Sequence, residues 1–148
     1  RVPLDWVMLA NSLTVYTHSA ELLDWVARLG EQRVAVINSA VFNAGFLIGG
    51  RFFDYRVVSE SSPEDKPLFA WRAKFLDLCE RHAVLPAAAC VQFGLSPPQV
   101  SSVSLNTSRP ERVAQCVELA TTQIADEFWS EAKQLGLIRQ SYPHLAST

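Results

Sequence analysis

The segment from Val34 to Leu47 constrains the fold of this chain more than any other. It opens with four apolar residues, three of them β-branched, and then becomes small and polar at Asn38, Ser39 and Asn43. An all-apolar strand is typical of a parallel sheet covered on both faces. Ligands of parallel α/β folds bind at the carboxyl ends of the strands. The polar residues that follow this strand are therefore the first candidates for a functional site, although a buried strand followed by an ordinary polar loop also fits.

Composition excludes several classes of protein. The chain has 148 residues, enough for one domain, and its 49% hydrophobic and 19% charged residues indicate a folded protein. A formal net charge of -2 gives no electrostatic reason to bind nucleic acid or an anionic membrane. No apolar run approaches the roughly 18 residues that a membrane span needs. Three widely spaced cysteines without a C-x-x-C pair argue against a disulfide framework or a metal site and favour a reducing, cytoplasmic location.

Hydrophobic periodicity and turn residues predict an alternation of strands and helices. Ser19 is a good N-cap for a helix that we expect Gly30 to end. We expect strands at 4–10, from 34, and at 100–105; helices at 19–29, 67–82, 86–93, from 110, and at 126–135; a long polar loop at 49–66; and a loose tail from 139.

Apolar stripes at helical spacing predict which residues are buried. The helix that begins near Pro110 presents one such stripe, and the final helix another. The tryptophans also stand at positions that we expect to face the core. The residues expected to be buried are Val113, Cys116, Val117, Ala120, Trp129, Ala132 and Leu135, together with Trp6, Trp25 and Trp71.

Three parallel strands do not close a sheet. Two strand edges would keep unpaired N–H and C=O groups, and the strand faces would be only partly covered. The fold class that we predict is therefore α/β, the C-terminal part of a TIM (β/α)8 barrel with about three parallel strands and their covering helices.

Three collinear segments resemble the aldo-keto reductases. The segment 35–49 reads A-V-I-N-S-A-V-F-N-A-G-F-L-I-G and is similar to the seventh strand and following loop of that family. The segment 79–93 reads C-E-R-H-A-V-L-P-A-A-A-C-V-Q-F and is similar to its seventh helix, and 103–113 to its eighth strand and next helix start. The resemblance is strongest to the sugar-oxidising branch that contains L-fucose and D-threo-aldose dehydrogenases.

The resemblance implies a barrel that binds NAD(P) in extended form, without the Rossmann G-x-G-x-x-G fingerprint, which this sequence lacks. The family transfers hydride between nicotinamide and a carbonyl or hydroxyl carbon. Its catalytic tyrosine, aspartate, lysine and histidine come from the first four strands. Residues 1–148 correspond to strands six to eight, so we expect the N-terminal half and every catalytic residue to be absent and the chain alone to be inactive.

The same resemblance implies one set of cofactor-binding residues after the central strand. Ser39 falls where many members place an aromatic ring under the nicotinamide, and the sugar-oxidising branch has a small residue there. Ala40, Val41, Phe42 and Asn43 match the loop that follows the pyrophosphate and ribose. Backbone N–H groups bind phosphate whatever the side chain.

A second implied set follows the last strand. Asn106 stands where NADPH-preferring members carry a lysine for the 2′-phosphate, which favours NAD over NADP because a neutral amide supplies no charge. Thr107 and Arg109 lie next to it, and Arg112 matches the family's adenine and phosphate arginine. Gln115 and Cys116 replace the usual glutamate and asparagine on the adenine amino group, and cysteine is a poor substitute.

These residues lead to three hypotheses. The first is an NAD(P)-dependent oxidoreductase of sugars or related hydroxy and carbonyl compounds, of which this chain is the cofactor-binding part. The second is a non-catalytic aldo-keto reductase-like binding or assembly module. The third is an independent α/β domain without a cofactor. The partners expected are a small sugar or aldehyde, and either the missing half-barrel or a second copy at the exposed strand edges.

Overall fold

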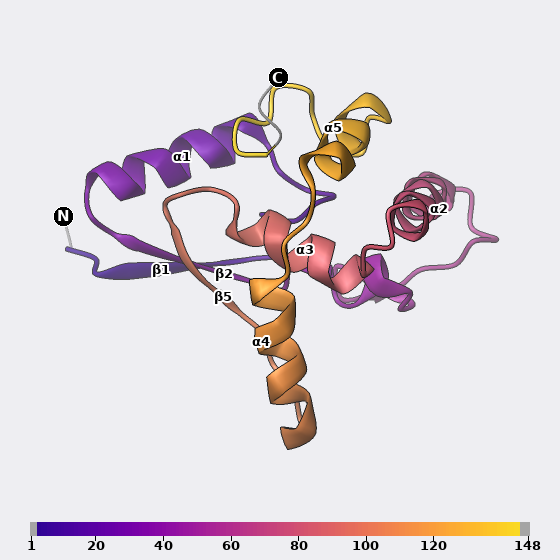
Figure 1. Cartoon of the computed structure of the whole chain (residues 1–148), viewed down its shortest axis with the longest axis horizontal. Helices are drawn as coiled ribbons and strands as arrows, with labels where there is room; N and C mark the ends of the chain where they lie inside the picture. The colour runs from indigo at the N-terminus through magenta and orange to yellow at the C-terminus, as the bar shows by residue number, and fades with distance from the viewer. Residues whose placement is uncertain (1–2, 146–148) are drawn as a thin grey trace.

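A three-stranded parallel sheet lies at the centre of the computed structural model, which describes residues 3–145 (Figure 1). The strands lie in the order β1-β2-β5, and a two-stranded antiparallel hairpin, β3-β4, stands apart from them. The bounds of the strands are β1 (Trp6–Ala10), β2 (Ala35–Ser39), β3 (Phe52–Phe53), β4 (Arg56–Val57) and β5 (Val100–Ser104).

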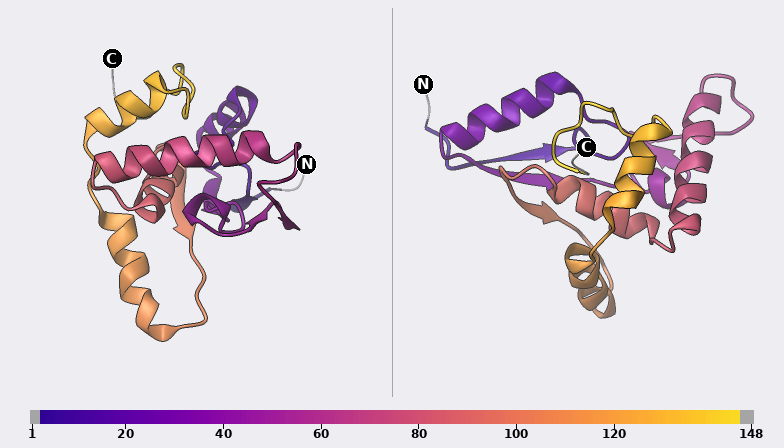
Figure 2. Two further views of the ribbon diagram at one scale, coloured as in Figure 1. Left: turned by 90° about the vertical axis from the view of Figure 1, so that its right-hand side faces the viewer. Right: turned by 45° about the horizontal axis from the view of Figure 1, so that its top comes forward.

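Helices connect the strands and pack mainly on one another and on one side of the sheet. Helix α1 packs against β2, α3 against β5, α4 against α3, and α2 against α5 (Figures 1 and 2). Their bounds are α1 (Ala20–Glu31), α2 (Lys66–Arg81), α3 (Pro86–Leu95), α4 (Val113–Thr121) and α5 (Asp126–Gln134), with short 3-10 helices η1 (Phe46–Ile48) and η2 (Pro110–Arg112).

The strand register brings the three carboxyl ends to one edge of the sheet. Ala10 of β1 is paired with Ser39 of β2, and Ser39 is also paired with Ser104 of β5. The predicted strand–helix–strand unit and the third parallel strand are therefore confirmed. The loops that follow β2 and β5 leave the sheet side by side, which is the arrangement that a site at this edge requires.

One face of the sheet is only partly covered by the described residues, as expected of three parallel strands that do not close a barrel. Side chains alternate between the two faces of a strand. Val36 and Asn38 point to the helix-covered face and are fully buried. On β1 the neighbouring residues Trp6 and Met8 keep 56% and 49% of their surface exposed. Trp6 is thus not the core residue that the sequence indicated, because no segment within 3–145 covers this face.

Helix α1 begins as predicted and ends later. The Ser19 hydroxyl accepts the N–H of Leu22 at 3.2 Å, as an N-cap should. The helix continues past Gly30 to Glu31, and the left-handed residue that follows is Arg33, with φ of 58°. Gly30 instead allows a close contact with Gln99, because a Cβ there would lie 2.5 Å from its Cγ and that side chain would have to move.

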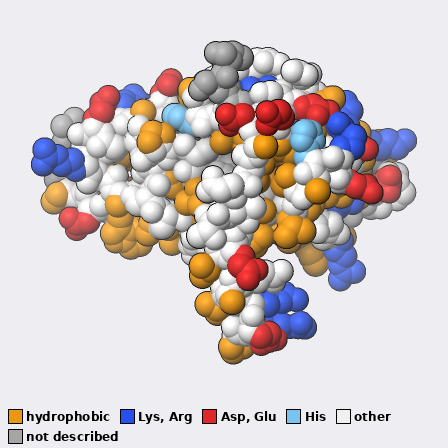
Figure 3. All heavy atoms as spheres, viewed as in Figure 1, with side chains coloured by type: hydrophobic (Ala, Val, Ile, Leu, Met, Phe, Trp, Pro, Cys, Tyr) orange, Lys and Arg blue, Asp and Glu red, His pale blue; other side chains and the backbone are white. Residues whose placement is uncertain are grey.

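Helix α4 does not bury the stripe that its periodicity predicted. Val113 and Val117 are 55% and 59% exposed, and only Leu119 of this helix is buried. Figures 1 and 2 show α4 projecting away from the other elements, and hydrophobic side chains lie along its surface in Figure 3. Trp25 and Leu135 are likewise exposed, at 38% and 40%, whereas Trp129 and Ala132 are buried as predicted.

The segment predicted as a long polar loop contains the β3-β4 hairpin. Arg56 in β4 donates to the buried Asp65 carboxylate at 2.6 Å, and the N–H of Ser59 donates to the same carboxylate at 2.9 Å. The guanidinium of Arg56, followed by this backbone N–H, holds the pKa of Asp65 below its ordinary value. Because Asp65 immediately precedes α2, these bonds tie the hairpin to the start of that helix.

The C-terminal segment is packed, contrary to the prediction of a loose tail, as far as residue 145. Tyr142 is 1% exposed, and its ring stacks on Phe93 of α3 with centroids 4.6 Å apart. Its hydroxyl is 2.7 Å from the hydroxyl of Ser96. Residues 146–148 lie outside the described part of the chain.

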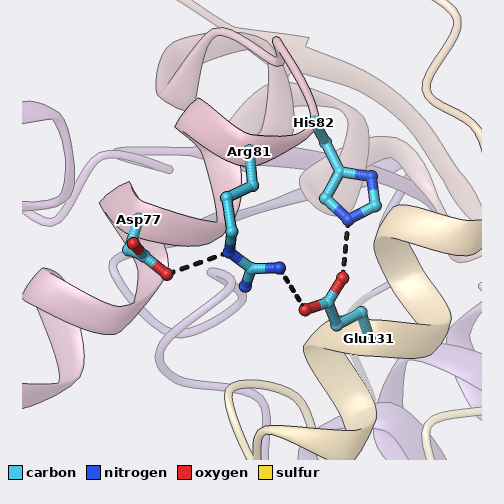
Figure 4. A network of polar contacts seen from close by, with 4 residues as sticks. All are labelled: Asp77, Arg81, His82 and Glu131. Atoms are coloured by element: carbon cyan, nitrogen blue, oxygen red, sulfur yellow. Dashed lines mark hydrogen bonds and ion pairs between the residues drawn. The ribbon is translucent and has the colours of Figure 1, made fainter.

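A polar network joins α2 to α5 (Figure 4). Nε2 of His82 lies 2.7 Å from a Glu131 carboxylate oxygen, and Arg81 donates to the other oxygen. Arg81 also donates to Asp77 one turn earlier, at 3.0 Å. The hydrogen bonds from His82 and then Arg81 lower the pKa of Glu131.

The buried imidazole of His18 predicts a pH dependence of stability. Its Nδ1–H donates to the carbonyl of Thr14 and its Nε2 accepts the N–H of Arg139, each at 3.2 Å. Burial away from water lowers the pKa of His18 below its ordinary value, and the nearby charge of Arg139 contributes in the same direction. The folded chain therefore binds fewer protons here than the unfolded chain. The stabilisation is present above the ordinary value of about 6.5 and is lost as the pH falls below it.

Urea unfolding between about pH 7.5 and about pH 5.5, above the range in which carboxylates titrate, measures this effect. We expect the free energy of unfolding to fall with pH in the wild type. In His18→Gln, whose amide also accepts a hydrogen bond but does not titrate, the decrease should be smaller. Equal pH dependence in the two proteins would contradict the role of His18.

Candidate functional site

The candidate site lies where the loops after β2 and β5 leave the same edge of the sheet. Ser39 and Ser104 are paired neighbours at the ends of these two strands. Each loop carries one of the two residue sets that the resemblance implies. The fold thus brings the two sets to adjacent strand ends, although they are more than 60 residues apart in the sequence.

Asn38 fixes the end of β2. Its side chain is fully buried, and its Nδ2 donates to the carbonyl of Leu13 at 2.9 Å and to that of Gly94 at 3.2 Å. The amide therefore joins the loop after β1 to helix α3. A Cβ at Gly94 would lie 2.9 Å from both the Asn38 amide nitrogen and Cγ1 of Val41, so glycine permits this close approach.

The loop after β2 has a left-handed backbone at several positions. Ala40, Asn43 and Ala44 have φ of 56°, 47° and 57°, and Gly45 and Gly49 have φ of 90° and 99°. Residues other than glycine seldom adopt this conformation, and it persists only where the surroundings impose it. Such strain is concentrated at functional sites. The loop is therefore a candidate for ligand binding independently of any resemblance.

Side chains in this loop are mostly buried. The Ser39 hydroxyl donates to the carbonyl of Leu9 at 2.8 Å. Val41 is fully buried in a small cluster with Ala88 and Val91, while Ala40 and Phe42 are partly buried. Asn43 is 2% exposed, and its Oδ1 has no hydrogen-bond partner among residues 3–145. A buried amide oxygen without a partner is costly, so a donor from a ligand would stabilise it.

The loop after β5 forms an open polar depression of about 540 Å³, lined by Asn106, Thr107, Ser108 and Arg112. The Thr107 hydroxyl accepts the N–H of Arg109 at 3.1 Å, which shapes the turn into η2. A guanidinium, an amide and two hydroxyls are suited to binding phosphate or ribose oxygens. Arg109 is exposed beside this depression but does not line it.

The remaining two predicted residues are not brought into the polar depression. Gln115 is exposed on α4. Cys116 is half-buried and lines a different, apolar depression of about 400 Å³ between α4 and β5, together with Val113, Val117 and Leu105. The structure thus places Asn106, Thr107 and Arg112 together, Ser39 to Asn43 at the adjacent strand end, and Cys116 in a separate depression.

The donor set fits the polar end of a dinucleotide. The exposed guanidinium of Arg112, beside the amide of Asn106 and the hydroxyl of Thr107, carries this fit. Within the described part of the chain, no group of three or more His, Cys, Asp or Glu residues is placed to hold a metal ion. No helix between residues 3 and 145 combines the length and apolarity that crossing a bilayer requires.

Sequence reasoning missed two residues that shape this edge. Asn38 was identified only as a polar residue at a strand end, and its two acceptors lie 25 and 56 residues away. Arg72 of α2 donates to carbonyl groups of the loop after β2. An asparagine inside an apolar run was a usable signal for the first, whereas no local pattern distinguishes Arg72 from an ordinary surface arginine.

A model of the aldo/keto reductase family matches residues 2–136, which is nearly the whole chain. The chain therefore belongs to the aldo/keto reductase family. Pyridoxal 4-dehydrogenase of Microbacterium luteolum is similar to it, with 28% identity over 135 residues. The match covers 91% of this chain but only 39% of the length of that relative.

The family membership agrees with the parallel strands and helices described above, which form part of a barrel that residues 3–145 do not close. The sugar-oxidising branch is not distinguished by these matches and stays a prediction.

The buried amide of Asn38 predicts a stability effect. Asn38→Ala would leave the carbonyls of Leu13 and Gly94 without their side-chain donor, so we expect the free energy of unfolding to fall by about 1–3 kcal/mol. Asn106→Ala is the matched control, since Asn106 is exposed and should change the value by less than about 0.5 kcal/mol. Urea titration measures both. Similar midpoints for the two variants would rule out the proposed role of Asn38.

Proposed function

We propose that this chain is the cofactor-binding part of an NAD(P)-dependent oxidoreductase that acts on sugars or related hydroxy and carbonyl compounds. The observation that supports this most is the meeting of a strained, buried loop and a polar depression at one edge of a parallel sheet, in a chain of the aldo/keto reductase family. In parallel α/β folds this edge is where ligands bind.

In this proposal the two loops hold different parts of the cofactor. Backbone N–H groups of Ala40, Val41 and Phe42 face the pyrophosphate and ribose, with Asn43 at the end of this segment, where its own N–H donates to the carbonyl of Ala40 at 3.1 Å. Asn106, Thr107 and Arg112 hold the adenosine end, with Arg109 nearby. Gln115, exposed one turn after Arg112, is assigned to the adenine amino group. The apolar surroundings of Cys116 make it the assignment with least support.

Bound NAD(P) supplies hydride chemistry, and this chain supplies binding. Its loops exclude water from one side of the cofactor and orient it toward the barrel interior. The proposal places the proton-transferring residues outside these 148 residues, in a preceding half-barrel that pairs with the free strand edges. The chain spans 39% of the length of its pyridoxal 4-dehydrogenase relative. We therefore propose the oxidoreductase activity for the complete protein and not for these 148 residues alone. We also propose a cytoplasmic location, on the cysteine usage discussed above.

A non-catalytic aldo-keto reductase-like module is the second candidate, favoured by the position of Cys116 in an apolar depression instead of at the adenosine site.

NAD-linked turnover of L-fucose or of pyridoxal by the complete gene product separates the two candidates. Turnover of either supports the enzyme, and the preferred substrate decides between a sugar and an aromatic aldehyde. Tight binding of NADH without turnover of any sugar or aldehyde supports the module.

The neutral side chain of Asn106 predicts the cofactor preference. Because an amide adds no positive charge beside Arg112, we expect the complete gene product to bind NADH at least as tightly as NADPH. Asn106→Lys should tighten NADPH binding about tenfold and leave NADH binding within about twofold, since a charge-assisted hydrogen bond to the 2′-phosphate is gained only by NADPH. Fluorescence titration with each nucleotide measures these affinities.

Asn106→Gln, which lengthens the side chain without adding charge, is the control and should leave the ratio of the two affinities unchanged. If Asn106→Lys raises neither affinity, Asn106 does not face the 2′ position. If the wild type binds neither nucleotide, the proposed function fails.

The uncovered face and edges of the sheet predict self-association of the 148-residue chain. Trp6 and Met8 expose apolar surface beside the free edge of β1, and unpaired edge strands recruit further strands. Sedimentation velocity should show an average mass that rises with concentration. Met8→Lys should reduce this rise, because a charge on an exposed strand face opposes association. A concentration-independent monomer in both proteins would exclude association through this face.

A further inference from the structure

Arg72 makes two kinds of contact with the end of the loop after β2. Its Nη1 donates to the carbonyl of Gly50 at 2.8 Å and, more weakly, to that of Phe46 at 3.4 Å. The same guanidinium lies 4.3 Å from the ring centroid of Phe46 and 4.6 Å from that of Phe69. Arg72 therefore lies beside two aromatic rings that also contact each other, with centroids 5.3 Å apart, while it bonds to the loop backbone.

The end of the loop that Arg72 contacts is tightly closed. The N–H of Gly50 donates to the carbonyl of Gly45 at 2.9 Å, and a Cβ on Gly50 would lie 2.7 Å from that oxygen. The N–H of Gly49 donates to the carbonyl of Phe46 at 3.1 Å. The backbone of the loop thus returns to within hydrogen-bond distance of itself at Gly45 and Gly50, next to the guanidinium.

The start of the loop is held differently. Val41 is fully buried against α3, and Asn38, just before the loop, bonds to α3 and to the loop after β1. Between these anchors lie the left-handed residues Ala40, Asn43 and Ala44. A strained loop keeps one conformation only if both of its ends are fixed. In the described part of the chain, Arg72 is the charged side chain that bonds to the backbone of this loop.

We propose that Arg72 is a positioning residue, which clamps the carbonyls of Phe46 and Gly50 and so holds loop 40–50 in the conformation that binds the cofactor. The inference rests on the proposed function, since it takes that loop to be a cofactor loop. Arginine suits the position because its planar guanidinium stacks on aromatic rings and offers several donors in a fixed geometry. Lysine would keep the charge and hydrogen-bond donors but lose the planar group that stacks on the rings and the fixed geometry of the donors.

Hydrogen exchange and NADH titration on the complete gene product test the clamp. In Arg72→Met we expect the amides of residues 45–50 to exchange about tenfold faster, while β5 exchanges as in the wild type. The dissociation constant for NADH should rise about tenfold at a temperature where both proteins are folded. Lys74→Met removes an exposed charge from the same helix and should change neither quantity.

Arg72→Lys keeps the test decisive if Arg72→Met unfolds. We expect intermediate loop exchange and intermediate NADH affinity, with a thermal midpoint near that of the wild type. Unchanged exchange at residues 45–50 in Arg72→Lys overturns the clamp. Faster exchange with unchanged NADH affinity overturns the role in cofactor binding. Failure of the wild type to bind NADH overturns the proposed function, whereas the exchange result still decides the clamp.

Discussion

The buried amide of Asn38 is the contact on which the geometry of the site edge depends. Burying an amide is costly unless it is hydrogen-bonded. The Nδ2 of Asn38 donates to the carbonyls of Leu13 and Gly94, while its Oδ1 has no partner among residues 3–145. These bonds fix the end of β2 relative to the loop after β1 and to α3. Gly94 and Val41 then pack so closely against Asn38 that no side chain fits at residue 94. The loop that follows therefore starts from a rigid point.

From that rigid point the chain enters a loop whose backbone is left-handed at Ala40, Asn43 and Ala44. Such a conformation opposes folding locally and is maintained by the buried Val41 and Phe46 and by the bonds from Arg72. Loop 40–50 and the distant helix α2 are thereby coupled. Proteins commonly retain strain of this kind where a backbone must meet a ligand in one shape, and the unpartnered Oδ1 of Asn43 lies in the same loop.

Local patterns predicted the order of the elements well and the burial of their faces less well. The Ser19 cap and the three parallel strands are confirmed because capping and alternation are local properties. The stripe of Val113 and Val117 was correctly placed on one face of a helix, yet periodicity does not say whether another segment covers that face. The packing of Tyr142 on Phe93 depends on residues 49 positions apart, which no local rule detects.

The candidate site shows the same difference between features set by neighbouring residues and features set by distant ones. Asn106, Thr107 and Arg112 lie within one turn region and were brought together as a short-range motif implies. Cys116 instead lines a separate, apolar depression beside β5. Gly30 illustrates a residue whose purpose depends on a distant neighbour, Gln99. Its presence at a helix end suggested a cap, but its close neighbour is a side chain nearly 70 residues away, which would have to move if residue 30 carried a Cβ.

Strands β1 and β5 are the two edges of the sheet among the described residues, and an apolar face beside β1 is exposed. Such edges and faces are usually covered by further strands or other segments. The most direct test is a crystal structure of the complete gene product with NADH. We predict that β1 and β5 will each be hydrogen-bonded to a further strand of a closed barrel, with the nucleotide in contact with loop 40–50 and with Arg112. A three-stranded sheet that stays open in the complete protein, or a nucleotide bound away from both loops, would contradict this interpretation.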